Sequence, residues 1–448
     1  MKHPRLKWSL GLAAVGLLVL LWVGRPSTEG TASAELAALR RMGHPTSWAE
    51  MNARLPSIPA SENAGPALQA TLGRMSSDGF DEALSKVFDS GRDPVVPWSG
   101  AERTAAEAVT ATNAAAFAVL HAVLQRPRLL LVPNLVPGGA PDGPSAFDFI
   151  QAARLLDLRT GCASRGQRSA EAAESIGDAL ALARCLGAPP NLVAAIFHQA
   201  VFGITLTSLE GALHHARFTD PELRGLQTAL DRGWTTDLAE RAIVAELCYA
   251  RALSETPGTV FRDTVLSKGP PGSLRELADG LYVQFFAAAG LQRQDFPFYA
   301  RRMVRYLEIV RGDPAQRERL LTTAQAETQR WIQDHYWRTR FSAAVMPRFF
   351  SALEQDPQNQ VRNRAAHAAL AIERYRLEHD DELPPTLDVL VPGFLNRVPQ
   401  DIYAAAPLRF RKLDRSYVLY SVGRDLKDDG GPISTSDNAP DITFRVTR

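Results

Sequence analysis

The sequence is poor in cysteine and lacks the short motifs that identify the common enzyme classes. It has no His-Glu-x-x-His, Gly-x-Ser-x-Gly or Gly-x-Gly-x-x-Gly pattern and no P-loop, so zinc-protease, hydrolase, dinucleotide and phosphate-loop sites are unsupported. The cysteines Cys162, Cys185 and Cys248 are odd in number and form no Cys-x-x-Cys pair, which excludes a disulfide framework and a zinc ribbon. Buried, unpaired thiols are expected. One bridge between Cys162 and Cys185 is the less favoured alternative.

The chain also lacks an excess of charge of either sign. Lys and Arg number 50 and Asp and Glu number 49, a formal net charge of +1. This balance argues against a nucleic-acid partner, because such proteins need a basic face to neutralise phosphates. Hydrophobic residues make up 45% and charged residues 22% of the chain, as in folded globular proteins. A length of 448 residues predicts two or three domains.

One long uncharged apolar run is present, from Trp8 to Gly24, with Lys2, Arg5 and Lys7 before it and Arg25 after it. Its length is at the short end of what spans a hydrocarbon core of about 30 Å. Positive charges that precede such a run keep the N-terminus in the cytoplasm. The sequence therefore predicts a single transmembrane anchor through residues 8–24 in a bacterial inner membrane, with the body of the protein in the periplasm.

A cleaved signal peptide is the alternative for this segment. The nearest Ala-x-Ala pattern, Ala32-Ser33-Ala34, lies rather far beyond the apolar run. An uncleaved cytoplasmic tail and anchor, residues 1–24, is therefore favoured. Residues 25–33 are small and polar, which predicts a flexible tether.

From residue 34 to about 356 apolar residues recur at spacings of three and four, the periodicity of amphipathic helices. One helix is predicted over Thr104–Gln125. Ala153–Ser164 and Ser169–Leu186 form a predicted pair, and further helices begin after Pro189-Pro190 and at Asp220 as N-cap. We expect a stack of α-hairpins. It is similar to tetratricopeptide repeats in periodicity only, because the spaced Trp, Gly, Tyr and Pro positions of that repeat are missing.

The character of the sequence changes in residues 357–448. A helix is predicted over about Gln360–His379, followed by a turn of helix at Leu387–Leu390 and by three β-like runs, Leu408–Arg411, Tyr417–Tyr420 and Ile442–Val446. A helix with a three-stranded antiparallel sheet is an α+β module. The predicted fold class is thus mainly α, with a helical body over 34–356, a small C-terminal α+β module over 357–448 and an N-terminal transmembrane helix.

The order of these C-terminal elements resembles the C-terminal half of the major pseudopilin of type II secretion systems. The resemblance covers about the last fifth of the chain and rests on five segments: Tyr375–Glu378, Leu383-Pro384, Val398–Asp401, Tyr420–Asp425 and Asp441-Ile442. The chain departs from that family in two ways. More than 300 residues separate the apolar run from the module, and no leader-peptidase site lies near the anchor. Assembly into a pilus-like fibre is therefore not expected.

In the pseudopilin, the loop after Ser-x-Gly-x-Asp folds around calcium, so the resemblance implies a Ca²⁺ site between Ser421 and Asp441. Asp425 and Asp441 match acids of the family, and Ser421 matches the backbone-carbonyl end of the loop. The family's remaining acid falls on Ala439, and Asp437 is a predicted replacement for it. Carboxylate and carbonyl oxygens are the ligands that Ca²⁺ prefers.

Asp428 and Asp429 are alternatives to Asp437 as the missing ligand. The competing interpretation of the whole segment is a solvated acidic turn, since runs of Asp and Gly, such as those in Leu426–Gly431, are typical of exposed turns.

The whole layout is similar to that of membrane-anchored bacterial envelope proteins, a resemblance that implies no activity. We predict a non-enzymatic envelope protein that presents a helical surface to a protein partner and is linked to secretion or envelope assembly. No catalytic residue is predicted. The alternative is an envelope hydrolase whose active site is dispersed along the sequence.

Overall fold

The structure is a computed structural model, and it describes residues 32–55, 58–59, 61–76, 78, 96–126, 129, 131, 146–188, 191–256, 284, 286–336, 338–346, 350–404, 406–432 and 441–447. The predicted anchor over residues 8–24 and nearly all of the tether over 25–33 lie outside this part of the chain. So does Asp437, one of the predicted calcium ligands.

The described part of the chain is mainly helical, with 14 α-helices, one 3-10 helix and three strands. The helices described before residue 257 are α2 (Ser33–Arg41), α3 (Trp48–Ala53), α4 (Gly65–Leu72), α6 (Gly100–Thr112), α7 (Ala114–Leu124), α8 (Ala146–Arg165), α9 (Ser169–Gly187), α10 (Leu192–His215), α11 (Asp220–Gly233) and α12 (Leu238–Glu255). The later elements are α15 (Gln292–Arg311), α16 (Pro314–Asp334), α17 (Arg340–Val345), α18 (Phe350–Glu378), η2 (Leu387–Leu390), β1 (Arg409–Leu413), β2 (Ser416–Ser421) and β3 (Ile442–Val446).

The small sheet confirms the predicted C-terminal strands. Its order is β1-β2-β3 and both neighbouring pairs are antiparallel. The central strand β2 alternates its side chains between the two faces, so Tyr417 and Leu419 point toward one side and Val418 and Tyr420 toward the other. Tyr417 donates a hydrogen bond of 3.1 Å to Glu373 of α18, which identifies the inner face.

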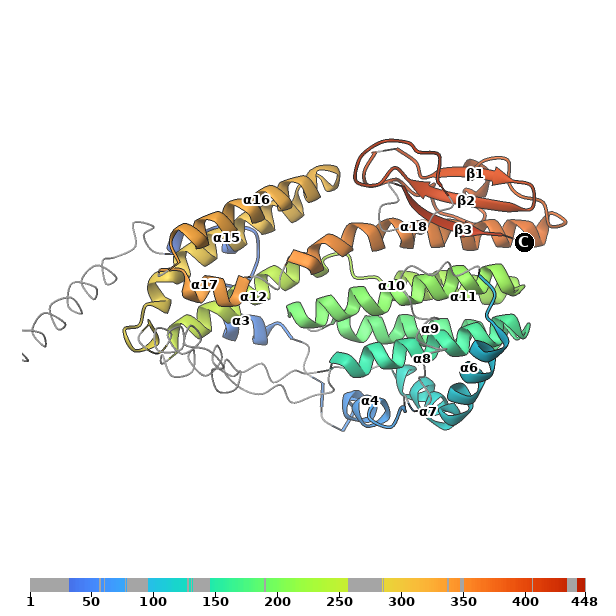
Figure 1. Ribbon diagram of the computed structural model, residues 1–448, viewed down its shortest axis with the longest axis horizontal. Helices are drawn as coiled ribbons and strands as arrows, with labels where there is room; N and C mark the ends of the chain where they lie inside the picture. Colours follow the sequence, from blue (N-terminus) through green and yellow to red (C-terminus); the bar gives the residue numbers. More distant parts are fainter. Residues whose placement is uncertain are drawn as a thin grey trace, which may run out of the picture.

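Helix α18 lies between the sheet and the helical body (Figure 1). Most of the buried apolar residues of α18 are alanines, which allow close packing on both sides: Ala365, Ala366, Ala368, Ala369 and Ala371. On its far side α18 packs against α10 and α11, and α9 and α8 follow beneath them (Figure 1). The sheet, α18 from Val361 to Ile372 and helices α4 to α11 share one hydrophobic cluster.

A second hydrophobic cluster is formed by α2, α3, α12, α15, α16 and α17, at the other end of the molecule (Figure 1). Helix α10 belongs to both clusters, since Leu192 and Ala195 lie in the second and residues from Val201 onward lie in the first. The hydrophobic core is therefore not divided at residue 357, because the C-terminal module shares its apolar contacts with α8 to α11. Whether residues 357–448 fold alone stays a prediction.

Two of the helices predicted for the helical body differ in the structure. The helix predicted over Thr104–Gln125 is two helices, α6 and α7, bent by 62°. At the bend, the side chain of Asn113 accepts a hydrogen bond from Ser76 N and donates one to Ser76 O, both of 2.9 Å. The N-cap of α11 is Thr219, whose capping box pairs it with Glu222, whereas Asp220 is the first helical residue.

The long helix α18 begins at Phe350, ten residues before the predicted start, and continues through Pro357. Proline removes a backbone donor and disfavours a helix interior. Side chains of α10 hold the helix on both sides of the proline. Gln199 Nε2 donates to Asp356 Oδ1 at 2.8 Å, and Asn359 Nδ2 donates to Gln199 Oε1 at 2.7 Å. The three cysteines are buried and unpaired, as predicted.

Among the described residues, α10 is the one single helix that is long and apolar enough to cross a membrane, with a mean hydropathy of 1.7. The bent pair of α6 and α7 passes the same test only when both helices are taken together. Of the most apolar window of α10, 61% is buried inside the protein, and the helix packs against α8, α9 and α18. The apolar character of α10 is thus accounted for by its central place in the core.

Candidate functional site

The candidate site is the segment that follows β2 and crosses the outer face of the sheet. Gly430 and Gly431 adopt φ of +80° and +61°, a conformation that glycine allows at little cost. At Gly431 the chain passes so close to the ring of Tyr420 that an added Cβ would lie 2.7 Å from Tyr420 Cδ1. Arg411 Nη2 also donates to Gly431 O at 2.9 Å. These contacts hold the segment against the outer face of the sheet.

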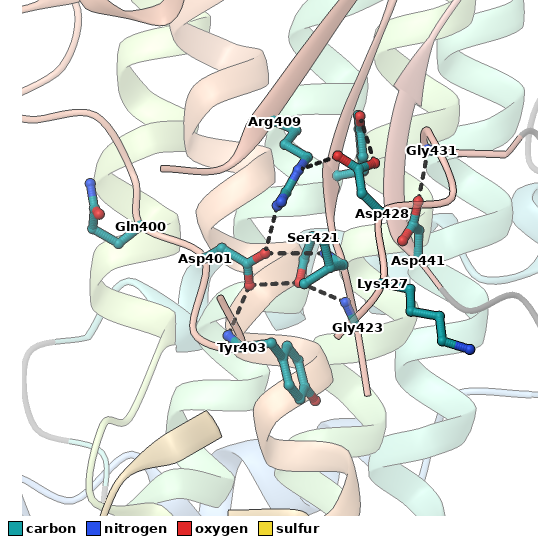
Figure 2. A network of polar contacts seen from close by, with 12 residues as sticks. Gln400, Asp401, Tyr403, Arg409, Ser421, Gly423, Lys427, Asp428, Gly431 and Asp441 are labelled. Carbon is teal, nitrogen blue, oxygen red and sulfur yellow. Dashed lines mark hydrogen bonds and ion pairs between the residues drawn. The ribbon is translucent and has the colours of Figure 1, made fainter. Parts of the chain in front are cut away.

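Asp401 is the buried centre of the polar network in this region (Figure 2). Its Oδ1 accepts hydrogen bonds from Tyr403 N at 2.9 Å and from Ser421 Oγ at 2.7 Å. Its Oδ2 accepts from Val422 N at 3.1 Å. Two segments that carry the pseudopilin resemblance, Val398–Asp401 and Tyr420–Asp425, therefore meet through one carboxylate. Buried charged groups need such partners, because an unpaired one is costly.

Arg409 of β1 lies between two carboxylates (Figure 2). Its guanidinium is 3.5 Å from Asp401 Oδ2, and its Nε donates to Asp428 Oδ2 at 2.8 Å. Asp428 also accepts from Gly430 N at 3.0 Å and from Tyr420 OH at 3.2 Å. The Gly430 amide, and then Arg409, lower the pKa of Asp428. These contacts favour the ionised form of Asp428 on the surface of the module.

Asp441 precedes β3 and is only 3% exposed. Its Oδ2 accepts a hydrogen bond of 2.8 Å from Gly431 N, whereas its Oδ1 is buried without a hydrogen-bond partner. Burial raises the pKa of Asp441, although the backbone amides of Gly431 and Asp429 lower it, and the negative charges of Asp429 and Asp428 raise it further. A buried, unpartnered carboxylate oxygen beside two further acids is an arrangement that a cation would stabilise.

The predicted ligands differ in their surroundings. Ser421 is buried, and its hydroxyl is used to hold Asp401 and to accept a hydrogen bond of 3.1 Å from Gly423 N. Asp425 is exposed, and its Oδ1 accepts from Lys427 N at 3.0 Å, as in an ordinary Asx turn. Among the predicted ligands in the described part of the chain, Asp441 alone combines burial with an oxygen that has no hydrogen-bond partner.

Asp425 and Asp441 do not belong to any group of three acidic, His or Cys residues with ligand atoms within 4.8 Å in the described part of the chain. The calcium site therefore stays a prediction. What the arrangement supplies is a set of hard oxygen atoms, which suits Ca²⁺ or Mg²⁺ better than a softer metal.

Two residues of this network, Asp401 and Arg409, were absent from the predicted site. Asp428 was named there only as an alternative calcium ligand and not as the partner of Arg409. Asp401 lies 20 positions before Ser421, and only its occurrence in the motif Val398–Asp401 pointed to it. Arg409 had no signal in the sequence, because a charged residue on a predicted edge strand is ordinarily a solvated one.

Four carboxyl groups of the helical body have a pKa raised by burial, to about 6 for the aspartates and about 7 for the glutamate: Asp157, Asp178, Asp356 and Glu246. Such groups mark many catalytic sites. These four come from four different helices, α8, α9, α18 and α12, and no three of them bring their carboxylate oxygens within 4.8 Å of one another.

Comparison of the chain with protein-family models, with curated proteins and with solved structures finds no match.

Proposed function

We propose that this protein is a membrane-anchored bacterial envelope protein without catalytic activity, whose helical body binds another envelope protein. The anchor is residues 8–24, the orientation is N-terminus inside, and the body lies in the periplasm. The proposal includes the finer description of the fold as stacked α-hairpins, of which α8 with α9 is one. Direct packing between α8 and α9, and of α10 and α11 against α9, supports that description.

The observation that carries the proposal is an exposed apolar patch at the beginning of α8 and α10. Phe147 is 76% exposed, and its ring meets the ring of Phe197 edge-on with centroids 5.6 Å apart. Val193, which is 55% exposed, lies one helical turn before Phe197 and hence on the same face. Contiguous exposed apolar side chains mark surfaces that other proteins cover.

The arrangement of the two ends is consistent with an anchored protein. Helix α2 begins at Ser33 and packs against α15, in the second cluster. The sheet lies at the opposite end of the molecule (Figure 1). An anchor that precedes α2 would thus hold the second cluster toward the membrane. The C-terminal module would point away from it, and the tether predicted over 25–33, which ends where α2 begins at Ser33, would connect anchor and body.

The cavity between α10, α11 and α18 is not a candidate for the active site of the hydrolase alternative. It has a volume of about 20 Å³, room for about one water molecule. Its charged residues are engaged with one another, since Arg376 Nε donates to Asp381 Oδ1 at 3.0 Å. An enzyme acting on envelope polymers needs an open cleft lined by converging acids, and this cavity is too small for one.

The proposal is tested by photo-crosslinking in intact cells. A photoreactive amino acid is placed at Phe147 or Val193, and at Val389 as a matched control, an apolar residue of similar exposure (44%) on η2 of the C-terminal module. We expect one discrete adduct of the same partner from Phe147 and Val193 and none from Val389. Equal adducts at all three positions, or none from the patch, would contradict the proposed surface.

A further inference from the structure

Helix α7 lies on the side of the helical body away from the sheet and packs against α9 (Figure 1). His121 is in the last turn of α7. Glu174 and Asp178 are four residues apart on α9, so their side chains leave the same face of that helix. Three ligand-bearing side chains from two helices are thereby directed at one point, although 57 positions separate His121 from Asp178.

The three side chains lie close to the geometry of a metal site. His121 Nδ1 lies 2.9 Å from Asp178 Oδ1, and one ligand atom from each residue lies within 4.8 Å of the other two. Ligand atoms about 2.0–2.2 Å from a tetrahedral Zn²⁺ are roughly 3.3 Å apart. Small changes in side-chain torsion therefore suffice to place all three on one ion.

A second observation points to a ligand at this place. Asp178 is 1% exposed, and its Oδ2 is buried without a hydrogen-bond partner. A carboxylate oxygen in that position has lost its hydration without forming a hydrogen bond, which costs free energy unless a cation or a donor binds it. His121 engages only the other oxygen, Oδ1.

Arg159 of α8 is the neighbouring cation, and two carboxylates of α9 fix its position. Its Nη2 donates to Glu174 Oε1 at 2.9 Å, and its Nε donates to Glu171 Oε1 at 3.3 Å. Arg159 thus occupies one oxygen of Glu174 and leaves the other available. Such contacts commonly orient the carboxylate that binds a metal. The positive charge of Arg159 lowers affinity, so moderate rather than very tight binding is expected.

We propose that His121, Glu174 and Asp178 bind a Zn²⁺ ion that fastens α7 to α9. One imidazole and two carboxylates form a borderline-hard ligand set that accepts Zn²⁺. Three protein ligands leave a fourth position open. That position faces the surface, because the side chains of Glu174 and His121 are each 38% exposed. The site is separate from the acidic segment of the C-terminal module and from the apolar patch.

The experiment is isothermal titration of the full-length protein, purified in detergent and stripped with a chelator, with Zn²⁺ and separately with Ca²⁺. We expect one Zn²⁺ per chain at this site. Asp178→Asn and Glu174→Gln should each weaken that binding at least tenfold. Glu171→Gln is the matched control, since Glu171 is on the same helix and contacts the same arginine but lies outside the ligand set. It should leave the affinity unchanged.

X-ray absorption of the zinc-loaded protein supplies an independent readout. We expect nitrogen and oxygen ligands at about 2.0–2.2 Å with the outer-shell scattering of one imidazole, and loss of the imidazole signal in His121→Gln. If Asp178→Asn fails to fold, the exposed Glu174→Gln variant carries the test. No zinc binding by the native chain, or binding that survives both Glu174→Gln and His121→Gln unchanged, overturns the proposal and leaves His121 and Asp178 as a structural pair.

Discussion

Ser421 Oγ donates a hydrogen bond of 2.7 Å to Asp401 Oδ1, and this contact joins the end of β2 to the loop that precedes β1. Val422 N and Tyr403 N complete the set of donors around the same carboxylate. The exit of the chain from β2 is therefore fixed by a buried negative charge, and the acidic segment beyond it begins from a defined position.

Asp401→Ala is expected to destabilise the protein by roughly 2–4 kcal/mol, because it leaves buried donors of Tyr403, Ser421 and Val422 without an acceptor. The measurement is chemical denaturation of the purified full-length protein. Asp414→Ala, in the exposed turn between β1 and β2, is the control and should stay within about 0.5 kcal/mol of the native chain. Equal effects of the two substitutions would show that the network adds nothing to stability.

Calcium is expected to stabilise the C-terminal module. A ligand that binds only the folded state adds about 2.7 kcal/mol at a hundredfold excess over Kd. Thermal melts in calcium and in chelator should therefore differ by a few degrees. Asp425→Ala and Asp441→Asn should each remove that difference, and Asp414→Asn should preserve it. Identical melts of the native protein in both buffers would identify the segment as a solvated acidic turn.

Asp356 predicts a specific pH dependence of stability. Burial raises its pKa to about 6, although the charge of Arg317 and the hydrogen bond from Gln199 lower it. Between the unfolded pKa of about 4 and the folded value, the folded state holds a proton that the unfolded state has lost. This group's contribution is therefore fully present at about pH 4 and is lost as the pH rises toward about 6.

The check is the free energy of unfolding of the native chain and of Asp356→Asn from pH 4 to 7. We expect the difference between them to shift in favour of Asp356→Asn by a few kcal/mol across this range, at about 1.4 kcal/mol for each unit of pKa. Asp388→Asn, on exposed η2, should run parallel to the native chain. Parallel curves for Asp356→Asn would mean that the aspartate stays ionised through its contact with Arg317.

The membrane topology is tested with a reporter enzyme that is active only outside the cytoplasm, fused after Arg448. It should be active, and the protein should resist extraction by high salt, because positive charges before an apolar run such as residues 8–24 favour an N-terminus in the cytoplasm. A mature protein that begins near Ala34 or Glu35 would instead identify a cleaved signal peptide.

Helix caps, proline and glycine stops and the spacing of apolar residues were sufficient to predict α8 to α11 and the three strands. Ser169 and Gly187 bound α9 almost as expected, and Ile442–Val446 is β3 without change. These boundaries depend on interactions within a few residues, such as caps, glycine turns and alternating side chains. Such short-range interactions can be identified from the sequence alone, because both partners are neighbours in the chain.

Only the tertiary structure decided the rest. The bend at Asn113 depends on Ser76, and the passage of α18 through Pro357 depends on Gln199 of a distant helix. The same holds for Asp401 with Ser421 and for His121 with Asp178. In each case a buried polar group is satisfied by a partner far away in the sequence. Periodicity indicates which face of an element is buried, but the identity of the facing group is set by how the elements pack.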